Sequence, residues 1–202
     1  MKKYLKNVFI ISILVTPLVS EAQEYKSAFG FATQISDNWA IVTADTISKN
    51  PDLLAFDNDE AKQMNASLIS QIKKMALSGK IEALYYKKSD GDFYDNVNLF
   101  VSRNSKSDLP QRAEEICAIM PGELKRAYGR DDYTKVYYCK YSNIYSIGAI
   151  NYSFDGGARG TRNYGYYFNT KANTITLTIT CKNERCADVK ADAELIFKNL
   201  KI

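Results

Sequence analysis

The chain has 202 residues, a formal net charge of +4, 46% hydrophobic residues and 25% charged residues. These values are typical of a soluble globular protein, and they exclude a disordered chain and a polytopic membrane protein. The sequence contains no His. This excludes Ser-His-Asp and Cys-His catalysis, zinc sites with His ligands, and His as a general base. The small net charge also gives no support for nucleic-acid binding.

The first 22 residues have the pattern of a secretory signal peptide. Three lysines precede an apolar run at residues 8–19, and Ser20-Glu21-Ala22 places small residues at positions −3 and −1. This pattern predicts cleavage after Ala22. A membrane anchor is disfavoured because a span needs about 20 apolar residues. We therefore expect residues 23–202 to form one domain that is periplasmic or secreted, with no stable membrane insertion after cleavage.

The first half of the mature chain predicts a strand, a helix and a hairpin. Alternation at residues 29–35 predicts a strand, and Asp37-Asn38-Trp39 predicts a turn before an apolar stretch at residues 40–42. Asp57 and Glu60 form a capping box before a helix that ends at Gly79. Residues 81–88 and 93–103 read as two strands, because Ser89-Asp90-Gly91-Asp92 between them is a strong hairpin signal.

The second half predicts two helices around a run of strands. A helix is expected from Leu109, with an interruption near Pro121-Gly122. Helical spacing of apolar residues from Cys186 to Leu200 predicts a closing helix. Between these helices we expect strands near residues 134–142, 144–153, 161–169 and 173–182.

The four cysteines predict two disulfides, because an even count in an exported chain is typical of disulfide bonding. Cys181 ends an alternating strand on its buried face, and Cys186 begins a helix five residues later, which favours Cys181–Cys186. Elimination leaves Cys117, on the apolar face of a helix, to pair with Cys139 in the next strand. A metal site is disfavoured because the spacing is not of the CxxC type.

Runs of strands with segregated helices predict an α+β domain on an antiparallel sheet. Ile35-Ser36-Asp37-Asn38-Trp39, the strand Phe93-Tyr94-Asp95-Asn96-Val97-Asn98, and the final strand, loop and helix resemble PsbP/Mog1-like domains. The resemblance implies a central sheet of about six or seven strands flanked by helices. It implies no chemistry, since such domains generally serve as binding or assembly factors.

No segment carries a recognisable catalytic motif. Ser70-Gln71-Ile72-Lys73 has the S-x-x-K form of serine acyl-enzymes, but the S-D-N at residues 36–38 precedes it and the K-T-G element is missing. Asp90, Asp92 and Asp95 could bind Ca²⁺, although a solvated turn is the favoured interpretation. Paired carboxylates for glycoside hydrolysis stay possible, because their spacing is spatial. We expect no catalytic residue, no metal and no cofactor.

Tyrosine is the most skewed residue, since nine of the 15 lie between Tyr133 and Tyr167. Cross-strand packing explains such a run, and an exposed recognition face is the alternative. A glycine-rich loop joins two Tyr-bearing strands, and we predict that Arg159, Arg162 and Tyr164 contribute to a protein-binding surface. The sequence thus predicts a non-catalytic binding or accessory protein. The alternatives are a periplasmic immunity protein that neutralises a toxic effector, and a carboxylate-based enzyme acting on envelope polymers.

Overall fold

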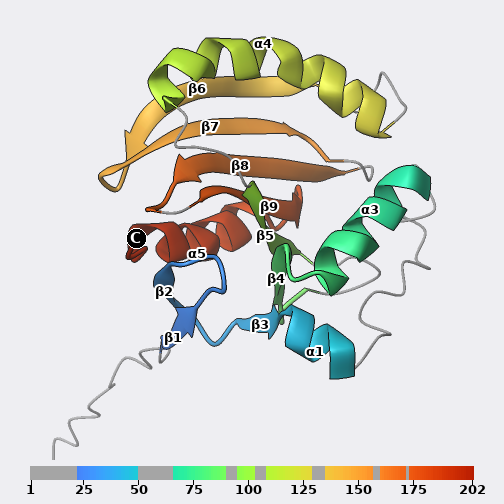
Figure 1. Cartoon of the computed structure of the whole chain (residues 1–202), viewed down its shortest axis with the longest axis vertical. Helices are drawn as coiled ribbons and strands as arrows, with labels where there is room; N and C mark the ends of the chain where they lie inside the picture. Colours follow the sequence, from blue (N-terminus) through green and yellow to red (C-terminus); the bar gives the residue numbers. More distant parts are fainter. Residues whose placement is uncertain are drawn as a thin grey trace, which may run out of the picture.

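A seven-stranded antiparallel sheet organises the computed structural model of this chain, which describes residues 22–49, 66–89, 95–102, 108–128, 135–156, 160–171 and 173–202 (Figure 1). A separate two-stranded hairpin lies beside it. The α+β architecture expected from the order of elements is therefore confirmed. In spatial order the sheet contains β3 (Trp39–Val42), β4 (Ile81–Tyr86), β5 (Asn96–Ser102), β9 (Thr174–Lys182), β8 (Thr161–Asn169), β7 (Ile147–Asp155) and β6 (Val136–Ile144).

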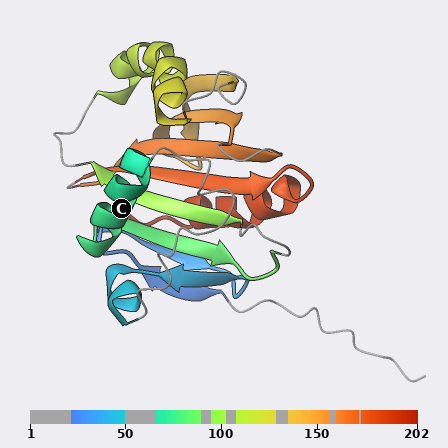
Figure 2. The same ribbon diagram turned by 90° about the vertical axis from the view of Figure 1, so that its right-hand side faces the viewer.

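Helices cover the two sides of this sheet differently (Figures 1 and 2). On the first side, called the α5 side, α5 (Cys186–Lys198) packs against β9 and against the hairpin of β1 (Gln23–Lys26) and β2 (Ala32–Ile35). On the other, called the α4 side, α4 (Leu109–Tyr128) covers β6 and β7, while α3 (Ala66–Leu77) contacts β4 and the short α1 (Ala44–Lys49). In the described ranges, no helix is long and apolar enough to cross a membrane.

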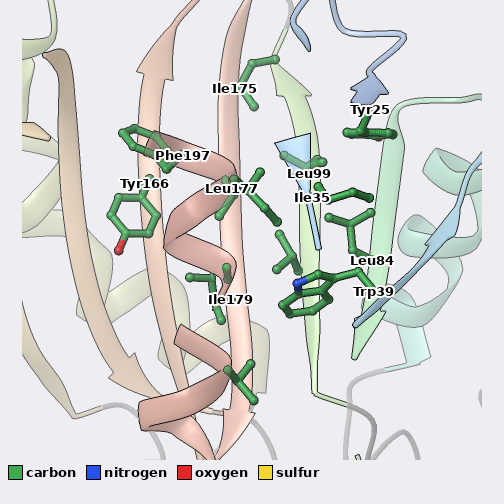
Figure 3. Close-up of a cluster of buried hydrophobic side chains, with 14 of the residues drawn as sticks. Tyr25, Ile35, Trp39, Leu84, Leu99, Tyr166, Ile175, Leu177, Ile179 and Phe197 are labelled. Carbon is green, nitrogen blue, oxygen red and sulfur yellow. The ribbon is translucent and has the colours of Figure 1, made fainter. Parts of the chain in front are cut away.

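The main hydrophobic core lies on the α5 side (Figure 3). The predicted alternation in β9 is confirmed, because Ile175, Leu177 and Ile179 are fully buried there. Burying side chains of this size stabilises the fold by about 1.5–3 kcal/mol each. Figure 3 shows Phe197 of α5 and Trp39 of β3 within the same cluster. This core fixes α5 on the middle of the sheet.

Both predicted disulfides are confirmed. Cys117 of α4 is bonded to Cys139 of β6, with their Cα atoms 5.5 Å apart. Cys181 of β9 is bonded to Cys186 at the start of α5, with their Cα atoms 5.1 Å apart. One bridge therefore holds α4 against the outer part of the sheet, and the other holds the beginning of α5.

The predicted interruption of the helix near Pro121-Gly122 is wrong, since α4 runs without a break. Proline removes one helical hydrogen bond, at a cost of about 3 kcal/mol. Both residues are exposed, so water can satisfy the carbonyl group that loses its donor. The apolar face of the helix is held at Leu109 and Ala113 against Ile150 of β7, which offsets that cost.

The first predicted strand is shorter than expected, because β2 begins only at Ala32. The preceding residues form a turn, in which Gly30 has a φ of 86° and the Ser27 N–H donates to the Phe31 carbonyl. Phe29 is nevertheless buried, as its alternation indicated. The predicted helix end at Gly79 is confirmed by its φ of 66°. The capping box at Asp57 lies outside the described residues.

Candidate functional site

The strand β6 and the ends of β7 and β8 near Asp155 and Arg162 extend beyond the residues on which α5 packs, since Phe197 of α5 contacts Tyr166 and Phe168 of β8. Residues paired across these strands share one side of the sheet, so Tyr138, Ser153 and Tyr164 form one row on the α5 side. Asp155 and Arg162 form the neighbouring row. We define the outer sheet surface by six residues: Tyr137, Tyr138, Arg162, Tyr164 and Lys190 on or beside these rows, and Tyr145 in the turn at the far end of β6.

An irregularity in β6 places two consecutive tyrosines on this surface. The register with β7 shifts between Val136 and Tyr138, as in a β-bulge, which re-aims side chains. Tyr137 and Tyr138 are both exposed, at 40% and 37%. In a regular strand, consecutive side chains would point to opposite sides. The bulge therefore brings a second aromatic ring to the outer sheet surface.

Tyr137 lies beneath two cations. The Arg162 guanidinium carbon lies 3.8 Å from the centre of its ring, and the Lys135 Nζ lies 4.8 Å from it. The Tyr137 hydroxyl donates a 2.8 Å hydrogen bond to Asp155. That hydrogen bond raises the pKa of Tyr137, since ionisation would break it. Contacts of this kind between a cation and an aromatic ring contribute about 0.5–1 kcal/mol at exposed sites.

The side of α5 that faces these strands carries a second charged group. Lys190 and Glu194 form an ion pair of 2.6 Å, and the Tyr166 hydroxyl donates to the same Glu194 oxygen at 2.7 Å. Burial, followed by the hydrogen bond to Glu194, raises the pKa of Tyr166. Burial alone lowers the pKa of Lys190, but the hydrogen bond and charge of Glu194 outweigh it and raise this pKa. The Lys190 Nζ also lies 5.3 Å from the ring centre of Tyr164.

A tight turn of unusual composition ends this surface. Tyr145 and Ser146 connect β6 to β7, with φ angles of 48° and 71°. Two-residue hairpin turns of this geometry favour Asn-Gly, because other residues are strained at positive φ. Tyr145 is nevertheless present and 49% exposed. Strain of this kind concentrates at functional sites, so the turn is a second sign of selection for an exposed ring.

The tyrosine-rich strands divide between the two alternatives that the sequence left open. On the α4 side, Tyr141 and Tyr167 pack against the cluster around Ile150. Tyr152 lies over Gly165 on the same side, where a Cβ atom would come within 2.0 Å of its ring. These three rings are structural. The rings on the α5 side, by contrast, include the exposed Tyr137 and Tyr138.

The structure brings together two of the three predicted binding residues. Arg162 and Tyr164 are half-buried and lie two residues apart on the α5 side of β8, in the strand itself. Arg159 lies outside the described residues. Sequence reasoning missed Lys190 and Glu194, whose spacing of four residues in a helix was the available signal. It also missed Tyr137, because an alternating pattern does not reveal a bulge.

The two most buried acidic residues are held by structural contacts. Glu82, 4% exposed, accepts hydrogen bonds from Tyr25, Ser27 and the Ala28 N–H. Asp95 is fully buried and pairs with Arg185 at 2.6 Å, so the interpretation of Asp95 as part of a solvated turn is wrong. Its partner's charge offsets the cost of burial there. Neither carboxylate is open to a substrate.

The remaining motif residues lie apart from the outer sheet surface. Ser70 and Lys73 are exposed on α3, as expected for the solvent face of an amphipathic helix. Asp90 and Asp92 lie outside the described residues. In the described ranges, no three acidic or Cys residues gather in a group that could hold a metal ion.

Comparison with known proteins gives a likeness of fold. No protein-family model and no curated protein matches this sequence. Among solved structures, PsbP (CyanoP) of the cyanobacterium Synechocystis sp. PCC 6803 is 8% identical, with a TM-score of 0.56 over 91% of this chain and 94% of that one. The chain has a PsbP-like fold. The resemblance inferred from residues 35–39 and from the final strand and helix is thereby confirmed.

Two further structures are more distant. A protein of Bacteroides thetaiotaomicron VPI-5482 is 11% identical, with a TM-score of 0.42 over 85% of this chain and 44% of that one. LpqN, which is involved in cell envelope biogenesis of Mycobacterium tuberculosis, is 10% identical, with a TM-score of 0.44 over 85% and 82%. A PsbP-like fold carries no particular function, so the function has to be argued from the site.

Proposed function

We propose that this protein is an exported, non-catalytic binding or accessory protein that contacts a protein partner through the outer sheet surface. One observation carries this proposal. Seven large hydrophobic residues of the described chain are exposed, and three of them, Tyr137, Tyr138 and Tyr145, lie within nine residues of each other. Tyr137 contacts the half-buried Arg162, and Tyr and Arg are enriched where protein interfaces gain most of their binding energy.

Two further features support export and binding without turnover. The disulfides Cys117–Cys139 and Cys181–Cys186 suit an oxidising compartment, such as the periplasm or the cell exterior. The buried carboxylates Glu82 and Asp95 are engaged by neighbouring groups. They therefore lack the access to substrate that an acid–base pair acting on an envelope polymer requires.

Photo-crosslinking in the native host tests the proposed surface. A benzophenone amino acid replaces Tyr138 in one variant and Ile119, which is 53% exposed on α4, in a matched control. We expect a discrete protein adduct from position 138 and none from position 119. Equal adducts at both positions, or none at position 138, would contradict the proposal. A toxic effector in the adduct would specify an immunity protein.

A turnover assay tests the non-catalytic part separately. The purified protein is incubated with isolated envelope polymers, and the release of soluble fragments is followed over time. We expect no release above that of the heat-denatured protein. Time-dependent release by the folded protein, above that of the heat-denatured protein, would establish the enzyme alternative instead.

A further inference from the structure

Most of the positive charge on and beside the outer sheet surface lacks a carboxylate partner. Four cations lie there: Lys135, Lys140, Arg162 and Lys190. Among the described residues, Lys190 forms an ion pair with Glu194, and the other three form none. Within the described chain, no carboxylate lies within 4.0 Å of the charged nitrogens of the other three. The surface therefore has an excess of positive charge that an anionic partner can neutralise.

The carboxylate opposite Arg162 in the sheet, Asp155, does not form an ion pair with it. Asp155 is directly opposite Arg162 in the register of β7 and β8, a position from which opposite charges normally pair. Asp155 instead accepts the hydrogen bond of Tyr137, whose ring lies under the guanidinium group. Asp155 is thus hydrogen-bonded to Tyr137 and forms no ion pair with Arg162, so the charge of Arg162 is not neutralised by a carboxylate of the described chain.

Two polar atoms at this point have unused hydrogen-bonding capacity. The buried side-chain atoms without a hydrogen-bond partner in the described chain are Arg162 Nε, Ser153 Oγ and Trp39 Nε1. Arg162 and Ser153 lie in neighbouring rows of the same side of the sheet, and Ser153 is only 1% exposed. Unpaired buried polar groups are uncommon in proteins and call for an explanation. Both atoms are buried, so they leave the polar groups beneath this surface only partly satisfied within the described chain.

We propose that the outer sheet surface binds an acidic, extended segment of a partner protein, with Arg162 receiving one of its carboxylates and Lys140 receiving a neighbouring one. This rests on the proposed function. Side chains on one side of an extended chain recur about every 6.8 Å, the same spacing as the rows of this sheet. Asp155 lies beside Arg162 and Glu194 lies beside Lys190, so negative charges alternate with the positive ones. A uniformly anionic membrane would be repelled by these carboxylates, whereas a peptide with acidic groups at intervals can avoid them.

The test uses two synthetic twelve-residue peptides, one with alternating Glu and Thr and one with alternating Gln and Thr. Binding to the intact protein is measured by fluorescence anisotropy at several salt concentrations. We expect the Glu peptide to bind, with an affinity that falls as salt rises, and the Gln peptide to bind much more weakly. Equal binding of the two peptides would overturn the proposal.

Variants assign the binding to this surface. Lys140→Ala and Arg162→Ala should each weaken binding of the Glu peptide by about two- to fivefold, the range for exposed ion pairs. Asp155→Asn should strengthen it, because a repulsive charge is removed. Arg126→Ala, which loses an exposed α4 arginine paired with Glu123, is the matched control and should change nothing. Because Arg162→Ala could also perturb the fold, the exposed Lys140→Ala and the gain from Asp155→Asn keep the test decisive.

Two outcomes separate this inference from the function on which it rests. If the crosslink at position 138 forms but the Glu peptide does not bind, the acidic segment is wrong and the protein-binding function stands. If phosphatidylglycerol vesicles bind in a manner that depends on Arg162 while the peptide does not, the ligand is a membrane and the proposal fails.

Discussion

The replacement Arg185→Ala tests how the beginning of α5 is held. Asp95 is fully buried, and its carboxylate accepts from the Arg185 Nε at 2.6 Å. The Lys182 backbone N–H at 2.8 Å and the Ser89 hydroxyl at 2.9 Å also donate to it. Removing the Arg185 side chain leaves those two donors but no cation. A buried carboxylate then keeps its charge without the partner that made its burial tolerable.

The expected cost is about 3 kcal/mol. Breaking a buried ion pair by removing one partner costs about 3–5 kcal/mol, and the lower end applies because the Arg185 side chain is 21% exposed. With a urea dependence of about 2 kcal/mol per molar, the midpoint of urea unfolding should fall by about 1.5 M. Circular dichroism during urea titration, with the disulfides intact, measures this shift.

Arg112→Ala supplies the matched control. Its ion pair with Glu115 on α4 is exposed and 3.8 Å long, so its loss should change the free energy of unfolding by less than about 1 kcal/mol. A loss of less than about 1 kcal/mol for Arg185→Ala as well would refute the reasoning. The result also bears on function, since Arg185 is the N-cap of the helix that positions Lys190.

Three other predictions concern the turn, the buried tyrosine and the disulfides. Ser146→Gly should raise the free energy of unfolding by about 0.5–1 kcal/mol in urea titrations, because glycine adopts the observed positive φ without strain. The pKa of Tyr166 is raised, so its hydrogen bond to Glu194 is intact below the ordinary tyrosine pKa of 10.0, and the free energy of unfolding falls as the pH rises above that value. In urea titrations between about pH 9 and 11, Tyr166→Phe should make the free energy of unfolding depend less on pH. A disulfide that closes a longer loop removes more entropy from the unfolded chain, so replacing Cys117 and Cys139 by serines should cost about 3 kcal/mol, and replacing Cys181 and Cys186 about 2 kcal/mol. Thermal unfolding measures both losses, and a larger loss for the Cys181–Cys186 variant would contradict this argument.

The sequence predicted best where a pattern and a covalent constraint agree. The alternation in β9 ends at Cys181, and the helical pattern of α5 begins at Cys186, so both elements and their disulfide follow from residue spacing. Pattern also located the strands from β4 to β8 to within a few residues. Local periodicity carries this information because burial on one side of a strand or helix depends on spacing alone.

The errors arise where tertiary packing outweighs a local preference. Pro121 usually ends a helix, yet α4 continues because its apolar face and the Cys117–Cys139 bridge hold it on β6. Asp95 follows a turn-like run of acidic residues, yet it is buried because Arg185, 90 residues later in the chain, pairs with it. No window of sequence contains both members of that pair.

The candidate site was predictable only in part. The excess of tyrosine between residues 133 and 167 indicated the strands on which we place the candidate site, and Arg162 and Tyr164 both lie on β8, although Arg162 was expected at the end of the preceding loop. The tyrosine rings that face solvent are determined by the bulge near Tyr137 and by how far α5 extends over the sheet. Both are properties of the assembled sheet, so the contribution of Lys190 could not be seen before the fold was known.

A comparison of the two sides of the sheet supports recognition on the α5 side. The polar side chains on the α4 side largely satisfy one another: Thr180 donates to Asn163, Thr174 donates to Asn169, and Asn98 donates to Asn96. On the α5 side, Arg162 Nε and Ser153 Oγ have no partner in the described chain, and exposed tyrosines surround them. Hydrogen bonds already made within the protein give a partner little to gain, whereas exposed aromatic rings beside a cation give it both affinity and orientation. The physical difference between the two sides thus favours the outer sheet surface over the α4 side for the binding that we propose.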